Sequence, residues 1–333
     1  MNSGGITLVT GGCGFIGRHL VNLLIKQGQK VRVLDLQGNT LTFKGSAEVW
    51  RGSILDKKLV KEAFKEVNVV YHLASNPHLW APNPQDFYHT NVTGTETVLK
   101  VARECKLEKF VYTSSETVLR SWRDQSNDLI NESTPLPQLE ELPGPYSKSK
   151  FMAEQLVMQH IADGLPAVVV YPTVPIGPGD VNLTPPTRMI RDFISGKNPA
   201  YMECNLNLVP VQLVAQGHLA AVQKGVIGGR YILGQDNYKL SELLTMIEEQ
   251  LGKSMPKTKI PYLAALASAK AMEWKAKFDS KPPRASVEGV RLAAANMHFD
   301  CTKSRQELGL VPGSLPEALI QAARWLQDQK LLK

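Results

Sequence analysis

Tyr146 and Lys150 have the residue types and the spacing that proton transfer requires. They are four residues apart in the segment Tyr146-Ser-Lys-Ser-Lys150, and residues four apart share one face of a helix. A phenol with a pKa of about 10 is a poor base at neutral pH, but an adjacent ammonium group stabilises the phenolate. Tyr146 is therefore a candidate general acid and base, with Lys150 lowering its pKa. Taken alone, the pair would be more typical of an ordinary surface helix.

A hydroxyl group that could hold a substrate oxygen lies in the segment Thr113-Ser114-Ser115, at the end of an apolar run. In open α/β sheets, ligands bind at the carboxyl ends of the strands. We select Ser115 as the residue that holds the substrate oxygen beside Tyr146. Ser114 and Thr113 are expected to form local hydrogen bonds with the loop backbone.

A glycine turn, Gly11-Gly-x-Gly-x-x-Gly17, follows the apolar residues 6–9 and precedes a helical pattern. Residues without a Cβ atom let the backbone approach a pyrophosphate, and the N-terminus of the next helix presents free N–H groups to that anion. Asp35, at the end of the second apolar run, is placed to accept hydrogen bonds from ribose hydroxyls and would repel a 2′-phosphate. We therefore predict a dinucleotide site that favours NAD over NADP.

The elements that must position these residues alternate between strand and helix. Apolar runs expected to be strands occupy residues 6–9, 31–34, 69–74, 110–113 and 167–171. Helical periodicity covers residues 59–64, 92–102 and 151–160, and residues 240–251 behind a possible cap at Ser241. This alternation predicts an α/β fold of Rossmann type, a doubly wound parallel sheet.

A smaller, interleaved substrate-binding lobe is expected after Tyr171, where closely spaced prolines make regular crossover helices improbable. Residues 228–234 resemble one more strand that returns to the sheet. We therefore predict an NAD-binding domain over residues 1–172 together with that strand. The substrate lobe would comprise residues 173–227 and 235–333.

Composition fits a globular enzyme of 333 residues, with 43% hydrophobic and 21% charged residues. The four cysteines form no Cys-x-x-Cys pair, so neither a disulfide framework nor a zinc ribbon is expected, and we predict no metal. The net charge of +7 is concentrated in the C-terminal part and is attributed mainly to solvation. The N-terminal segment lacks the features of a signal peptide. We expect a cytoplasmic location and no nucleic-acid partner.

In combination, these motifs resemble an extended short-chain dehydrogenase/reductase, and the resemblance covers essentially the whole chain. It rests on the glycine turn, Asp35, His72-Leu-Ala74, Asn91-Val-x-Gly94, Thr113-Ser-Ser115 and Tyr146-x-x-x-Lys150. It implies a catalytic triad of Ser115, Tyr146 and Lys150, and a homodimer formed through the helices that contain residues 91–102 and 146–160. The residues implied to bind or brace the cofactor are Gly11, Gly14, Phe15, Ile16, Gly17, Asp35, Ser53, Ile54, Leu73, Ala74, Ser75, Asn91, Thr113, Tyr146, Lys150, Pro172, Thr173 and Val174.

Within that family, the chain looks most like the branch of the hopanoid-associated sugar epimerase and the dihydroflavonol-reductase-like proteins. It departs from sugar-nucleotide members at Val174, where they usually carry Asn, and in residues 206–215, where they usually carry Arg and Asp. Glu116 matches an acid of the sugar 4,6-dehydratases, but Thr117 lacks their second carboxylate. Dehydratase chemistry is therefore not favoured.

The substrate side is expected to be largely apolar, which favours a lipid-like or ring-shaped alcohol over a sugar nucleotide. The residues assigned to substrate binding are Trp80, Ser115, Glu116, Tyr146, Val174 and Leu206. Residues 260–278 can form a helix with Leu263, Leu266, Ala267 and Trp274 on one side. A lid helix is favoured there over contact with a membrane surface.

Three functions remain open. The first is an NAD(P)-dependent oxidoreductase that interconverts a secondary alcohol and a ketone on a bulky, apolar small molecule. The second is a nucleotide-sugar epimerase with tightly bound NAD. The third is a non-catalytic protein that senses the dinucleotide, since a fold does not imply a function.

Overall fold

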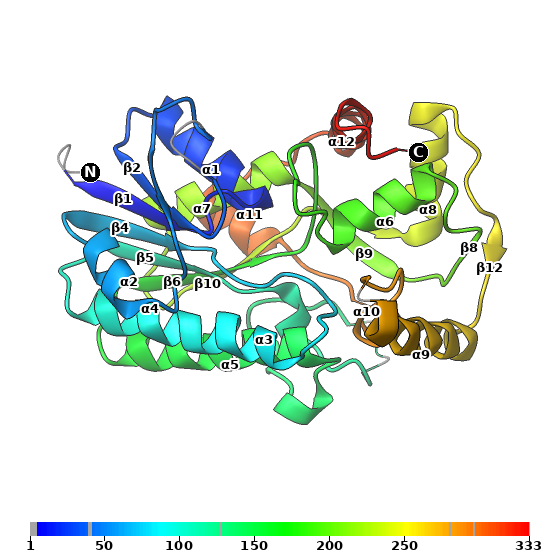
Figure 1. Cartoon of the computed structure of the whole chain (residues 1–333), viewed down its shortest axis with the longest axis horizontal. Coiled ribbons are helices and arrows are strands. Elements are labelled where there is room, and N and C mark those ends of the chain that lie inside the picture. The colour runs from blue at the N-terminus through cyan, green and yellow to red at the C-terminus, as the bar shows by residue number, and fades with distance from the viewer. Residues whose placement is uncertain are drawn as a thin grey trace.

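A seven-stranded parallel sheet dominates the computed structural model, which describes residues 5–38, 42–124, 126, 128–279, 281–295 and 297–332 (Figure 1). The strand order is β10-β6-β5-β4-β1-β2-β3. The strands are β1 (Ile6–Thr10), β2 (Val31–Asp35), β3 (Glu48–Arg51), β4 (Val67–His72), β5 (Lys109–Thr113), β6 (Ala167–Pro172) and β10 (Arg230–Leu233). From β1 the sheet grows in both directions, through β2 and β3 on one side and through β4, β5, β6 and β10 on the other. The predicted doubly wound topology is therefore confirmed.

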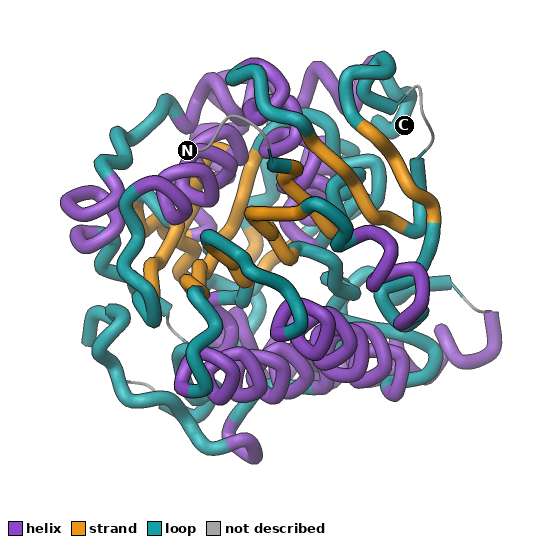
Figure 2. Tube along the Cα trace, turned by 90° about the vertical axis from the view of Figure 1, so that its left-hand side faces the viewer, coloured by secondary structure: helices purple, strands orange, loops and turns teal. Residues whose placement is uncertain are grey.

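Helices cover both faces of this sheet, and Figure 2 shows the strands with helices on either side. One face carries α1 (Phe15–Lys26), α7 (Val211–Gln223) and α11 (Thr302–Leu308), which contact one another through α7. The other face carries α2 (Lys57–Ala63), α4 (Gly94–Arg103) and α5 (Pro145–Ala162). All six residues of β6 are buried, because a parallel strand between two helical layers has no solvent-facing side.

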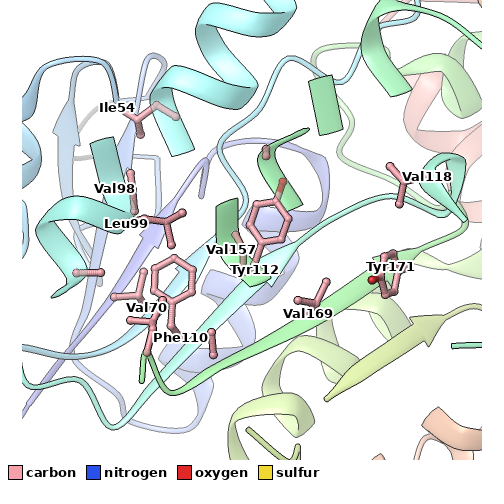
Figure 3. Close-up of a cluster of buried hydrophobic side chains, with 14 of the residues drawn as sticks. Ile54, Val70, Val98, Leu99, Phe110, Tyr112, Val118, Val157, Val169 and Tyr171 are labelled. Carbon is pink, nitrogen blue, oxygen red and sulfur yellow. The ribbon is translucent and has the colours of Figure 1, made fainter. Parts of the chain in front are cut away.

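The core divides according to the alternation of side chains along each strand. Phe110, Tyr112, Val169 and Tyr171 point toward α4 and α5, in the cluster drawn in Figure 3. Val111, which lies between Phe110 and Tyr112 on β5, packs on the opposite face, with α1 and α7. Successive strand residues point to opposite faces, so the same strand contributes to two hydrophobic clusters. These two clusters hold both faces of the large sheet and thereby fix the carboxyl ends of its strands, where ligands bind in open α/β sheets.

A smaller sheet with the order β11-β9-β7 forms the centre of the second lobe. Its strands are β7 (Val174–Ile176), β9 (Asn205–Pro210) and β11 (Asp236–Lys239), and a separate pair consists of β8 (Ala200–Tyr201) and β12 (Thr258–Lys259). The helices α6 (Pro185–Ile194), α8 (Leu240–Leu251) and α12 (Leu315–Asp328) pack on that sheet, while α9 (Tyr262–Asp279) packs with α10 (Val287–Ala294). This lobe is interleaved with the first, because β10 lies between β9 and β11 in the chain.

Four features differ from the expectations. Strand β3 has the burial pattern exposed, half-buried, half-buried, exposed, so its sequence lacks the apolar run of a central strand. The prolines near residue 185 begin α6, since proline is tolerated in the first turn of a helix. The cap of α8 is Lys239, so the expected Ser241 cap was wrong. Helix α7 packs on the large sheet although residues 173–227 were assigned to the substrate lobe.

A short helix, α3 (Gln85–Phe87), continues through a π-helical turn, Tyr88–Thr93, into α4. The wide turn carries Asn91, which is buried and points toward α5. Such a turn re-aims side chains within an otherwise regular helix. Among the described helices, none is long and apolar enough to cross a membrane.

Candidate active site

Tyr146 lies in the first turn of α5, where a carboxylate from the other lobe meets the helix. The Oε2 atom of Glu288, on α10, accepts a hydrogen bond from the backbone N–H of Tyr146 at 3.0 Å. Its Oε1 atom accepts from the N–H and the hydroxyl of Ser147, at 2.8 and 2.7 Å. The first N–H groups of a helix lack internal partners, so an acid there holds the helix end in place. Glu288 therefore connects the second lobe to Tyr146.

The structure brings Ser115, Tyr146 and Lys150 together, as predicted. Ser115 follows β5 and forms a hydrogen bond with the phenol of Tyr146. The Lys150 ammonium donates to the carbonyl of Thr113, at 2.7 Å, and lies 4.7 Å from the centre of the Tyr112 ring. All three residues of the triad thus converge on the end of β5, where a substrate oxygen could contact both hydroxyl groups.

Burial dominates the electrostatics of this site. It raises the pKa of Tyr146 well above its ordinary value, and the hydrogen bond between Tyr146 and Ser115 acts in the opposite direction. It also lowers the pKa of Lys150 to about 7, opposed by the charge of Glu154. A low-dielectric site disfavours every isolated charge. A phenolate at Tyr146 would therefore need neighbouring positive charge to offset its burial.

Glu116 adds a carboxyl group to this network. The Ser115 hydroxyl donates to its Oε2 atom at 3.1 Å, and the Thr117 hydroxyl donates to Ser115 Oγ at 3.1 Å. Burial raises the pKa of Glu116 to about 8, although the hydrogen bond from Ser115 lowers it. Near neutral pH this carboxyl can therefore hold a proton next to the substrate-binding hydroxyl.

The glycine turn leaves no room for side chains. A Cβ atom on Gly17 would lie 2.2 Å from the carbonyl oxygen of Gly11, and one on Gly11 would lie 2.7 Å from the amide nitrogen of Ala74. Gly11 also has a φ of +72°, which favours glycine. Gly14, Phe15 and the half-buried Ile16 lead directly into α1. The tight turn and the free helix N-terminus fit a dinucleotide pyrophosphate, which Gly14 and the residues after it would hold.

Asp35 ends β2 beside that turn. Its Oδ2 accepts from the amide of Cys13 and its Oδ1 from the amide of Gln37, both at 2.9 Å. The carboxylate is therefore oriented by backbone groups and keeps lone pairs for ribose hydroxyls. Arg51, on the unpredicted strand β3, is paired in register with Asp35 and donates to the carbonyl of Leu36. Sequence analysis missed this cation because β3 lacks an apolar run.

The loop after β4 is held by a buried polar chain. Thr10 Oγ1 lies 2.6 Å from His72 Nδ1, and His72 Nε2 lies 3.0 Å from Thr95 Oγ1. Burial and the charge of Lys150 lower the pKa of His72 to about 3, so its ring is neutral. Thr10 also accepts from the amide of Ala74. These contacts fix the loop that contains Leu73, Ala74 and Ser75, all half-buried and next to the glycine turn.

Asn91 joins that loop to the catalytic helix. Its side-chain oxygen accepts from the amide of Asn76 at 2.7 Å, and its amide group donates to Ser149 Oγ at 2.9 Å. Ser149 in turn donates to the carbonyl of Tyr146, at 2.7 Å. The role that the sequence suggested for Asn91, bracing the site, agrees with this geometry.

The remaining predicted cofactor residues divide by what their side chains contact. Ile54 packs into the core beside Val98 (Figure 3), so only its backbone remains for a ligand. Ser53 accepts from the amide of Leu55. Thr113 is bound to His218 through its hydroxyl, at 2.9 Å. Pro172 ends β6, next to Thr173, whose hydroxyl donates to Asn207.

The predicted substrate residues come from both lobes. Val174 begins β7 and is in register with Leu208 of β9, while the neighbouring Leu206 faces Tyr238 of β11. Val174 and Leu206 are half-buried and pack against the apolar cluster of the small lobe. Trp80 is half-buried in the loop after β4. The structure therefore leaves Val174 and Leu206 partly within the core of this lobe.

Two charged residues near the site carry no motif that could have revealed them. Glu288 acts across 142 residues of sequence, so only the fold could pair it with Tyr146. Arg188, on α6, lies near His78, whose pKa is lowered by burial and then by this cation. The apolar periodicity of α6 was obscured by its two initial prolines.

Arg120 has a structural role in the loop that follows Ser115. Its side chain is buried and donates to Asp124, at 3.1 Å, and to the carbonyls of Ser126 and Asp128. This arginine thereby folds the loop on itself.

No group of three or more His, Cys, Asp or Glu residues that could hold a metal occurs within the described ranges.

Comparison with known proteins agrees with this geometry. The sequence profile of the NAD dependent epimerase/dehydratase family matches residues 7–234. The chain is 33% identical over 330 residues to a Synechocystis protein named "Putative dihydroflavonol 4-reductase", covering 98% of this chain and 95% of that protein. It is 29% identical over 331 residues to sterol demethylase protein B of Methylococcus capsulatus, covering 98% and 99%.

A solved structure shows the same fold. The UDP-glucuronic acid 4-epimerase of Bacillus cereus, in complex with a fluorinated UDP-sugar and NAD, superposes with a TM-score of 0.77 at 20% identity, covering 97% of this chain and 99% of that one. Its likeness concerns the fold alone. The profile match spans more than half of the chain, so this protein belongs to the NAD dependent epimerase/dehydratase family, as an NAD-dependent enzyme of the extended short-chain dehydrogenase/reductase type.

Proposed function

We propose that this protein is an oxidoreductase that interconverts a secondary alcohol and a ketone on a bulky, largely apolar molecule. The observation that carries the proposal is the convergence of Ser115, Tyr146 and Lys150 at the end of β5. Ser115 holds the substrate oxygen, Tyr146 Oη exchanges a proton with it, and Lys150 stabilises the phenolate. NAD, when bound, supplies the hydride acceptor or donor.

The apolar class of substrate is supported by two independent features. Strand β9, Asn205–Pro210, carries no charged residue at the place where sugar-nucleotide enzymes of this family usually have anchors. Related proteins with apolar substrates in their names include sterol demethylase protein B and a farnesyl-dihydroquinoline-oxide ketoreductase of Stigmatella aurantiaca. An apolar pocket with few polar groups suits a polycyclic or isoprenoid alcohol, such as a steroid, terpenoid or flavonoid.

A nucleotide-sugar epimerase is the second candidate, and Arg188 is the observation that favours it. This half-buried cation near His78 is the sort of group that binds a diphosphate. In such an enzyme the NAD would be reduced and reoxidised within one turnover and would remain bound.

Absorbance of reduced nicotinamide separates the two. The purified protein, with NAD or NADP, is offered steroid, terpenoid and flavonoid alcohols beside UDP- and GDP-sugars. We expect net NADH formation with an apolar alcohol, with NAD favoured because Asp35 repels a 2′-phosphate. Isomerisation of a nucleotide sugar without net NADH, abolished in Arg188→Ala, would instead establish the epimerase.

A homodimer through α4 and α5 and a cytoplasmic location complete the proposal. Met152, on α5, is an exposed large apolar residue on one of these two helices. Analytical ultracentrifugation of the wild type and of Met152→Glu tests the dimer, which this substitution is expected to weaken.

A further inference from the structure

Helix α9 exposes three of its large apolar side chains and buries two alanines against α10. Ala265 and Ala269 are buried against Val290 of α10. Leu263, Trp274 and Phe278, in contrast, are 75%, 66% and 74% exposed. A helix that served only as a lid would bury its largest apolar residues, because they gain most from leaving water. The expected lid arrangement is therefore not what this helix shows.

The exposed apolar residues form one stripe. Leu263, Ala267, Trp274 and Phe278 are separated by intervals of four, seven and four residues, which keep them on one face of the helix. The Trp274 and Phe278 rings contact each other edge to face, with centroids 5.0 Å apart. Figure 1 shows α9 at the lower right edge of the molecule. The stripe is therefore exposed, and Lys270, seven residues after Leu263 and four before Trp274, lies on the same face.

Positive charge flanks this stripe. Lys270, Lys275 and Lys277 are exposed, and they form no ion pair with an acid in the part of the chain that the structure describes. Glu273 is half-buried and accepts from the amide of Val287, at 2.8 Å. Lys281 and Arg284, just beyond the helix, are also exposed. Aromatic residues between outward lysines are typical of helices that lie in the interface of a membrane.

We propose that this face of α9, which we call the α9 face, docks on the surface of an anionic phospholipid bilayer. The charge argues against a second copy of the chain, because two α9 faces in contact would bring Lys270, Lys275 and Lys277 of each copy together. An anionic bilayer supplies both an apolar layer for Leu263, Trp274 and Phe278 and negative headgroups for the lysines.

Helix α9 is also linked to the active site through α10, a link that deepens the proposed function and rests on it. Glu273 of α9 binds the start of α10, and Glu288 of α10 binds the start of α5 at Tyr146. A cavity of about 730 Å³ is lined by Ala293 of α10, by Tyr262 at the start of α9 and by Ile260 just before it, and Ser115, Tyr146 and Lys150 are not among its lining residues. An apolar alcohol dissolved in a bilayer would thus reach the protein on the side where its catalytic helix begins.

Vesicle sedimentation of the full-length protein with NAD tests the proposal. The probes are phosphatidylcholine vesicles with and without phosphatidylglycerol. We expect the wild type to sediment with the anionic vesicles, with at least tenfold weaker binding to the neutral ones and weaker binding at high salt. Trp274→Glu/Phe278→Glu should reduce binding at least tenfold. The matched control is Val226→Glu/Ile227→Glu, which changes two exposed apolar residues in another part of the surface.

Several results would overturn this inference. These are equal binding of wild type and the α9 variant, equal loss in the control variant, or a wild-type dimer that the α9 variant converts to monomers in buffer. Because no substrate is present, the sedimentation result is independent of the proposed function. NADH formation from a detergent-dispersed alcohol tests that function separately, and the α9 variant is expected to retain it.

Discussion

The cofactor side and the substrate side of this site are built differently, although both lie at the carboxyl edge of one sheet. On the cofactor side, Gly11, Gly17 and Asp35 are held by contacts with backbone atoms of the glycine turn and of the loop after β4. On the substrate side, Tyr146 depends on Glu288 from another lobe, and Ser115 leads into a loop folded by Arg120.

The difference shows which part of the protein is free to vary. Backbone that approaches a pyrophosphate tolerates few changes, because any Cβ atom meets other backbone atoms. Side chains that hold one loop or one helix end can be replaced by other partners. We therefore expect substitutions on the cofactor side to abolish binding, and those on the substrate side to alter turnover while NAD binding persists.

The largest effect is expected from Tyr146→Phe, which removes the hydroxyl that exchanges a proton with the substrate oxygen in the proposed function. The kcat should fall by about 10³-fold, the usual scale of general acid–base catalysis, while NAD affinity is retained. Tyr112→Phe is the matched control, because the buried Tyr112 hydroxyl has no hydrogen-bond partner among the described residues. Steady-state kinetics and NAD titration by fluorescence provide the measurement. Loss of NAD binding in Tyr146→Phe would contradict the separation of the two sides.

Gly17→Ala is expected to damage the cofactor side alone. The new methyl group would lie 2.2 Å from the Gly11 carbonyl oxygen, so the turn must open. NAD affinity should fall by about tenfold or more, and the free energy of unfolding by about 1–3 kcal/mol. Gly28→Ala is the control. Its new methyl group meets no atom within 4 Å, although Gly28, unlike Gly17, has a positive φ. Calorimetric titration with NAD should show a normal affinity for this control. An unchanged affinity in Gly17→Ala would show that the turn is not the pyrophosphate site.

Glu288→Ala should act on turnover through Tyr146, as a positioning residue. It leaves the N–H groups of Tyr146 and Ser147 without an acceptor, which costs about 1–3 kcal/mol of stability. We expect a fall of about tenfold in kcat with an unchanged KM for NAD. Asp56→Ala is the matched control, since it removes a comparable side-chain cap from α2, a helix that carries none of the three triad residues. If Asp56→Ala lowered kcat equally, the effect of Glu288 would be general destabilisation.

The smallest effect concerns the pH dependence of stability at Glu116. Burial raises its pKa from 4.5 to about 8, so the folded protein binds more protons than the unfolded chain between these values. Stability should therefore fall as the pH rises from about 4.5 to 8. In Glu116→Gln, the fall in the free energy of unfolding between these pH values should be smaller by about 1 kcal/mol or more. Glu140→Gln, at an exposed position, should show the same fall as the wild type. Urea denaturation at several pH values measures the stability of both variants. The same pH dependence in Glu116→Gln and in the wild type would contradict a raised pKa of Glu116.

Local sequence patterns determined the chemistry of this protein. The spacing of the glycines, the Tyr-x-x-x-Lys pair and the apolar runs each depend on the geometry of one turn, helix or strand. The sheet that brings them together was therefore predictable, as was the membership of the family. Elements without a clean apolar pattern were not: β3 is half exposed, and α6 begins with two prolines.

Tertiary structure alone decided how the two lobes cooperate. Glu288 and Tyr146 are 142 residues apart, and nothing in either segment indicates the other. The outward orientation of α9 was also undetermined, because its sequence carries apolar residues on more than one face and only packing of Ala265 and Ala269 on α10 selects which face is buried. Periodicity specifies which residues share a face, whereas the identity of the face that meets the protein depends on the neighbour that covers it.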